Sequence, residues 1–189
     1  MSSRRLSQAI AEGDGISLLV EVAHAADAET AGAARAEGLV VRGHGKMTDS
    51  TALPVLAYGP TPDAAAALGA DAVVLPGSVD DDALHELARR TLELGLEPVV
   101  HVRDEDDLER VLEELDPEVL LLSVEAGEEQ EPLERLLDLL PDVPAGKLAI
   151  ADLASASRAD VEELERAGVD AVVVAGDVAG LAGDAPPEV

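Results

Sequence analysis

One segment, Gly95–Ser123 (GLEPVVHVRDEDDLERVLEELDPEVLLLS), constrains the fold more than any other part of the chain. Its apolar run at Pro98–Val102 predicts a strand, the acidic and amphipathic stretch after it predicts a helix, and Val119–Ser123 predicts a second strand. A strand, a helix and a strand within about 25 residues form a βαβ unit, whose two strands run parallel. We therefore expect a parallel sheet with its chemistry at the carboxyl ends of the strands.

The same unit recurs along the chain. LGADAVVLPG and AGVDAVVVAG both end a helix with glycine and then enter a short apolar strand, and AEGLVVRG is a looser copy. Eight strands are predicted, at 16–22, 39–42, 54–58, 72–75, 98–102, 119–123, 147–152 and 171–175. Besides the helix of the opening segment, we expect helices at 28–37, 61–68, 80–94, 133–140 and 158–167, no convincing helix between 43 and 51, and a flexible tail at 180–189.

Eight βα modules whose strands are buried on both faces predict an α/β fold, a compact single-domain (βα)8 TIM barrel over residues 1–189. Such barrels usually have about 250 residues. This chain of 189 residues therefore needs shortened loops. A doubly wound open sheet is the alternative, but no G-x-G-x-x-G phrase follows the first predicted strand.

The charge of the chain limits its partners and its environment. Forty Asp and Glu residues against thirteen Lys and Arg give a formal net charge of −27. Such a field repels nucleic acid and anionic membranes, so neither is an expected partner. We interpret the charge as an adaptation to a cytoplasm at molar salt, where the screening length is about 3 Å. The longest apolar runs have strand length and the segment after MSSRR is polar, so we expect no membrane span and no signal peptide.

The candidate catalytic residues are those at the carboxyl ends of the predicted strands, where (βα)8 barrels carry their sites. Glu21, His101 and Asp152 lie there and could form an acid–base set, although polar residues that merely fill the barrel mouth are an equal reading. Arg103 shares a strand face with His101 and is the candidate to orient an anion. The absence of cysteine excludes thiolate catalysis and zinc held by cysteine.

Phosphate sites in such barrels usually use the loops after the last two strands. Ser155 and Gly176 lie in those loops and are candidate phosphate ligands, although Asp177 would repel a dianion. Ser123, at the end of the sixth strand, is a further candidate for a small anionic or phosphorylated ligand.

A metal site can be drawn from His24, His44 and His101 with a carboxylate, since imidazole and carboxylate are ordinary ligands. No H-x-H or H-E-x-x-H spacing supports it, so we expect neither a metal nor a cofactor. His85 lies in the middle of a predicted helix and is expected at the surface.

Several phrases, among them GADAVVL, LGLEPVV and VRDEDDLERVL, occur in an order that resembles indole-3-glycerol-phosphate synthase, the (βα)8 lyase of tryptophan biosynthesis. The resemblance runs roughly from Leu6 to Val178 and is best from Pro54 to Ser123. It implies a (βα)8 barrel and, for an unaltered member, ring closure and decarboxylation of an anionic, phosphorylated substrate.

The residues that this resemblance marks as catalytic are largely replaced. The family's first strand carries Glu-x-Lys, which here becomes Glu21 and Ala23, and the lysine of its third strand, a general acid, becomes Tyr58. Its fifth-strand glutamate is His101. The other departures are Ser123, Val124 and Glu125 for Asn-Asn-Arg, Ala151 to Ala154 for Ser-Glu-Ser-Gly, and Ala175 to Asp177 for Gly-x-Ser.

Three hypotheses follow for the function. The first is a degenerate, non-catalytic relative that serves as a binding or scaffold barrel. The second is an enzyme with altered chemistry on a small anionic or phosphorylated substrate, using Glu21, His101 and Asp152. The third is a retained role in tryptophan biosynthesis, through a partner subunit. The sequence leaves the oligomeric state open.

Overall fold

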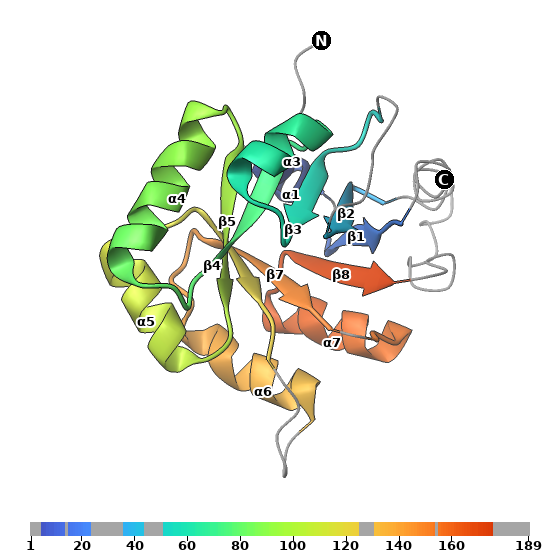
Figure 1. The fold of residues 1–189 in the computed structure, drawn as a ribbon. Coiled ribbons are helices and arrows are strands. Elements are labelled where there is room, and N and C mark those ends of the chain that lie inside the picture. The colour runs from blue at the N-terminus through green and yellow to red at the C-terminus, as the bar shows by residue number, and fades with distance from the viewer. Residues whose placement is uncertain are drawn as a thin grey trace.

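The computed structural model describes residues 5–13, 15–23, 36–43, 51–124, 131–153 and 155–175. Eight strands close into a barrel in sequence order, and every neighbouring pair is parallel (Figure 1). The strands are β1 (Ser17–Glu21), β2 (Gly38–Arg42), β3 (Val55–Tyr58), β4 (Ala72–Pro76), β5 (Glu97–Val102), β6 (Val119–Leu122), β7 (Leu148–Asp152) and β8 (Ala171–Ala175). The described helices are α1 (Leu6–Ala11), α3 (Pro62–Leu68), α4 (Asp81–Glu93), α5 (Glu105–Glu114), α6 (Pro132–Leu139) and α7 (Arg158–Ala167), with a 3-10 turn, η1, at Leu140–Asp142.

The closed barrel confirms the predicted (βα)8 fold and excludes the open sheet. Every predicted strand is present, with ends within one residue of those expected. Most of the helix predicted at 28–37 and the whole of the tail predicted at 180–189 lie outside the described residues. None of the helices in the described part of the chain has the length and apolar character needed to cross a membrane.

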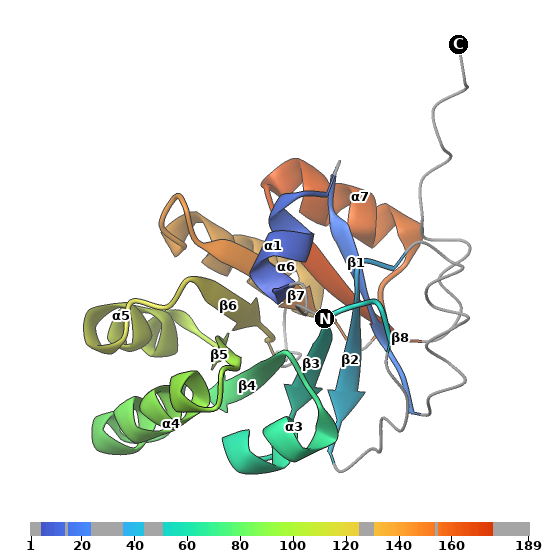
Figure 2. The same ribbon diagram turned by 90° about the horizontal axis from the view of Figure 1, so that it is seen from above.

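Helix α1 was not predicted, and its position explains why. It has six residues, and its N-cap residue Arg5 makes no side-chain cap, so it has little intrinsic stability. Leu6 and Ile10 are buried with the side chains that fill the barrel, so α1 covers the amino end of the barrel (Figure 2). Tertiary packing therefore holds a helix that local sequence does not specify.

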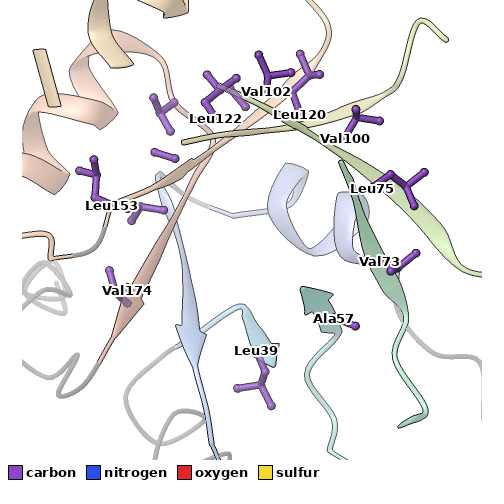
Figure 3. Close-up of a cluster of buried hydrophobic side chains, with 14 of the residues drawn as sticks. Leu39, Ala57, Val73, Leu75, Val100, Val102, Leu120, Leu122, Leu153 and Val174 are labelled. Atoms are coloured by element: carbon purple, nitrogen blue, oxygen red, sulfur yellow. The ribbon is translucent and has the colours of Figure 1, made fainter. Parts of the chain in front are cut away.

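Side chains alternate between the two faces of each strand, and both faces are buried. The inward set fills the barrel, and the outward set forms a second cluster with buried residues of the helices. Figure 3 shows members of this second cluster, among them Leu75, Val100 and Leu122. The inward apolar residues of the strands are Leu19, Val40, Leu56, Ala72, Val74, Val99, Val119, Leu121, Ile150, Ala171 and Val173, with Leu148 partly buried beside them.

The repeated GADAVV and GVDAVV phrases act at the amino end of the barrel. Asp71 Oδ2 accepts a hydrogen bond from the first N–H of β3 at 2.9 Å, and Asp170 Oδ2 accepts one from Ala149 of β7 at 2.8 Å. In the looser copy, Glu37 Oε2 accepts from the N–H of Leu18 at 2.9 Å. Each carboxylate thus ties down the start of a preceding strand, and the repeat is a stabilising device rather than a site.

Candidate functional site

Six polar or aromatic side chains form what we call the mouth cluster. Each lies two residues after the last inward-facing apolar residue of its strand, so its side chain is on the same, inward face. All six therefore face the carboxyl opening of the barrel. The predicted catalytic residues Glu21, His101 and Asp152 all lie in this cluster. The full cluster is Glu21 (β1), Arg42 (β2), Tyr58 (β3), His101 (β5), Ser123 (after β6) and Asp152 (β7).

Arg42 is the centre of the mouth cluster. Its Nε donates to Glu21 Oε2 at 2.8 Å, and its Nη2 donates to Asp152 Oδ1 at 2.7 Å. Its Cζ lies 4.5 Å from the centroid of the Tyr58 ring, which is within cation–π range. Sequence reasoning placed Arg42 at a strand end but gave it no role, although the same alternation that selected Glu21 and Asp152 selects Arg42.

The electrostatics of the cluster favour a charged guanidinium. Burial works against the charge of Arg42, but the hydrogen bonds to Asp152 and Glu21 outweigh it and raise the pKa of Arg42. Burial also raises the pKa of Tyr58, and the charge of Asp152 adds to this effect, so the phenol keeps its proton near neutral pH. One cation faces two carboxylates, which leaves the cluster with one excess negative charge when both are ionised.

His101 and Ser123 form a second contact within the cluster. Nε2 of His101 lies 2.7 Å from Ser123 Oγ, a hydrogen-bond distance at which a proton can pass between the two groups. The His101 ring meets the Tyr58 ring edge-on, with centroids 5.7 Å apart. Burial lowers the pKa of His101, although the negative charge of Asp152 opposes the shift. The imidazole is therefore neutral at pH 7.

Arg103, the predicted anion ligand, points to helix α5. It follows the last residue of β5, and its Nε donates to Asp107 Oδ2 at 2.8 Å. Burial alone would raise the pKa of Asp107, but the hydrogen bond and charge of Arg103 outweigh it and lower that pKa. A small hollow of about 170 Å³ beside it is also lined by Val124 and Arg135. The ion pair with Asp107 accounts for the direction of Arg103, which strand alternation alone did not predict.

The remaining predicted residues are not part of the mouth cluster as described. Ser155 lines a groove of about 520 Å³ between α6 and α7, together with Leu133, Leu137 and several carboxylates. Gly176, His24 and His44 lie outside the described residues. In the described ranges no three His, Asp or Glu side chains gather in a way that could hold a metal ion.

A comparison with protein families gives the relationship of the chain. Residues 62–180 match the model of the family described as "Indole-3-glycerol phosphate synthase". The chain belongs to the indole-3-glycerol phosphate synthase family. The match begins at α3 and spans β4 to β8, so it includes His101, Ser123 and Asp152 of the mouth cluster.

Solved structures of other proteins share the fold. A 3-hexulose-6-phosphate synthase from Salmonella typhimurium has a TM-score of 0.63 and 19% identity, covering 85% of this chain and 89% of its own. An N-acetylmannosamine-6-phosphate 2-epimerase from Clostridium perfringens has a TM-score of 0.68 and 12% identity, covering 87% and 88%. A 2,3-dimethylmalate lyase has a TM-score of 0.68 and 15% identity, covering 92% and 80%. At such identities these similarities show the shared fold alone.

Proposed function

We propose that this member of the family is a binding or scaffold barrel that takes a small anionic or phosphorylated ligand at its mouth and does not carry out the family's lyase reaction. One observation carries the proposal: Arg42 is the single cation among the described inward-facing side chains at the mouth, and it is oriented by Glu21 and Asp152. A guanidinium oriented in this way suits carboxylate and phosphate groups, which it can bind through two parallel hydrogen bonds.

The loss of the lyase reaction follows from what the family's chemistry requires. By its resemblance to the family, this chain has Ala23 and Tyr58 where two lysines stand, and His101 where a glutamate stands. Arg42 supplies positive charge but no proton, because arginine does not deprotonate in proteins. A lost general acid alone lowers the rate by about 10²–10⁴-fold. We therefore expect turnover of the family substrate to fall below detection.

An enzyme assay tests the loss directly. The purified full chain in molar KCl is incubated with the anthranilate-derived, phosphorylated substrate of the family, and indole formation is followed by fluorescence. We expect no conversion above the background without protein. Appreciable conversion, or rescue of a tryptophan auxotroph in a high-salt host, would contradict the proposal and favour a retained pathway role. The molar salt is part of the proposal, since the net charge of −27 supports a high-salt cytoplasm as the working environment.

A second candidate function is an enzyme with altered chemistry. The contact between His101 and Ser123 favours it, because a neutral imidazole 2.7 Å from a hydroxyl can act as a general base. Glu21 and Asp152 would then orient Arg42 rather than transfer protons. In any assay that finds turnover, His101→Ala and Asp152→Ala should both reduce it, and this candidate is rejected if neither variant changes turnover or ligand binding.

A further inference from the structure

We propose that Glu21 is an internal competitor for the anion site: its carboxylate occupies Arg42 when no ligand is bound, and an incoming oxyanion displaces Glu21 while Asp152 stays in place. This inference rests on the proposed binding of an anion at the mouth. It adds which of the two carboxylates leaves. It also predicts that removing the charge of Glu21, a residue of the site, tightens binding of the anion.

The two carboxylates that hold Arg42 differ in burial. Their distances to the guanidinium are nearly equal, 2.8 Å for Glu21 and 2.7 Å for Asp152, but the Glu21 side chain is 34% exposed and the Asp152 side chain only 9%. A carboxylate that can turn into water loses little when its ion pair breaks, whereas a buried one is left desolvated and unpaired. Glu21 is therefore the partner that exchanges.

Arg42 stays oriented when Glu21 leaves. The centroid of the Tyr58 ring lies 4.5 Å from the guanidinium carbon, and Asp152 on β7 holds Nη2. Release of Glu21 frees Nε, whose only described partner in the mouth cluster is Glu21. A planar guanidinium edge fixed in this way recognises compact oxyanions, which are carboxylates and phosphates.

The charge balance supports the exchange. Arg42 and Asp152 cancel, so a ligand that carries one negative charge replaces Glu21 without changing the charge at the guanidinium. The displaced Glu21 carboxylate remains nearby and repels the bound anion. Removing its charge should therefore help phosphate, much of which is a dianion near neutral pH, more than acetate, which carries a single charge.

The experiment is isothermal titration of the full chain with inorganic phosphate and, separately, with acetate, at one fixed KCl concentration and pH. For phosphate we expect Glu21→Gln to bind about three- to tenfold more tightly than wild type. Arg42→Gln should abolish binding and Asp152→Asn should weaken it. Arg158→Gln, which breaks an exposed pair with Glu162 on α7, is the matched control and should bind like wild type.

A second variant guards against a folding defect. Glu21→Asp keeps the charge but is too short to hold Nε of Arg42, so it too should tighten phosphate binding, by less than Glu21→Gln. If Arg42→Gln abolishes binding but neither Glu21 variant tightens it, Arg42 is the anion ligand and the competitor inference is wrong. Tightening by Asp152→Asn overturns it as well. If phosphate and acetate bind to no variant, the proposed anion site itself fails, and the inference fails with it.

Discussion

Carboxylates act at both ends of the barrel, but against different partners. At the amino end, Asp71 and Asp170 accept hydrogen bonds from backbone N–H groups at 2.9 and 2.8 Å. At the mouth, Glu21 and Asp152 hold a side chain, Arg42. A backbone N–H is fixed in its strand and cannot turn towards a ligand unless the strand unfolds. In a side-chain ion pair, by contrast, the cation can exchange one anion for another. The difference teaches that acidic residues in this chain stabilise at one end and can regulate binding at the other.

Substitution at the amino end should give the largest effect on stability. Asp170→Ala leaves the N–H of Ala149 without its acceptor, and a buried unpaired donor costs about 1–3 kcal/mol in the free energy of unfolding. Urea denaturation in molar KCl measures the loss. Asp170→Asn is the control, because its amide oxygen can still accept the bond and should retain most of the stability.

The same variant sharpens the comparison between the ends. Phosphate binding by Asp170→Ala should equal that of wild type at temperatures where the variant is folded, because the mouth cluster contains no residue that Asp170 contacts through its side chain in the described structure. Weakened binding by a fully folded Asp170→Ala protein would show that the two ends are coupled, and the division of roles would be wrong.

At the mouth we expect the reverse: a large effect on phosphate binding and a small effect on stability. Arg42→Gln should abolish phosphate binding but cost only about 1 kcal/mol of unfolding free energy, because Glu21 is a third exposed and the shorter glutamine lets water from the barrel opening reach Asp152. Titration calorimetry and urea denaturation of one preparation measure both quantities. A loss of stability larger than that of Asp170→Ala would mean that Arg42 is chiefly structural.

These contrasts also explain what the sequence could predict. The strands were located within one residue because a continuous apolar run of only strand length, such as Val119–Leu122, is too short for a helix. Helix α1 was missed because its stability comes from Leu6 and Ile10 packing into the barrel, a contact between distant parts of the chain. The inward set at the mouth follows from alternation, but the pairing of Arg42 with two carboxylates depends on the register of three strand pairs, β1–β2, β1–β8 and β7–β8.

The direction of Arg103 could not be predicted for a related reason. Alternation placed it beside His101, but β5 ends at Val102, and the chain then turns into α5. The partner of Arg103 is Asp107 in the first turn of that helix, where an acidic residue also satisfies the helix dipole. A charged residue just after a strand can thus pair with the next helix instead of facing the mouth.

The two histidines with shifted pKa values should give opposite dependence of stability on pH. Burial lowers the pKa of His101, so below an unfolded pKa of about 6.5 the unfolded chain takes up a proton that the folded mouth resists. Stability should fall as the pH falls from about 7 until the lowered pKa is reached. His101→Gln should remove this part of the pH dependence, as measured by urea denaturation at pH 5 to 8, and an unchanged profile would contradict a neutral His101.

His85, on the exposed side of α4, should make the smallest contribution to the pH dependence of stability, with a sign opposite to that of His101. Its Nδ1 lies 2.8 Å from the carbonyl oxygen of Asp81 and its Nε2 lies 2.9 Å from that of Glu114, and both contacts are hydrogen bonds only if both nitrogens carry protons. These backbone bonds raise the pKa of His85. The stabilisation should therefore be complete below about pH 6.5 and be lost as the pH rises through the raised pKa.

His85→Gln tests the assignment, because glutamine cannot donate to both carbonyl oxygens in this geometry and does not titrate. Relative to wild type it should be less stable at pH 6 and equally stable at pH 9, where wild-type His85 has lost its proton. NMR titration of the His85 ring gives its pKa independently. If that pKa lies at or below 6.5, the ring is neutral and bonds only one carbonyl. Helices α4 and α5 would then be held together without a titratable donor, and the opposite pH dependence of His85 and His101 would disappear.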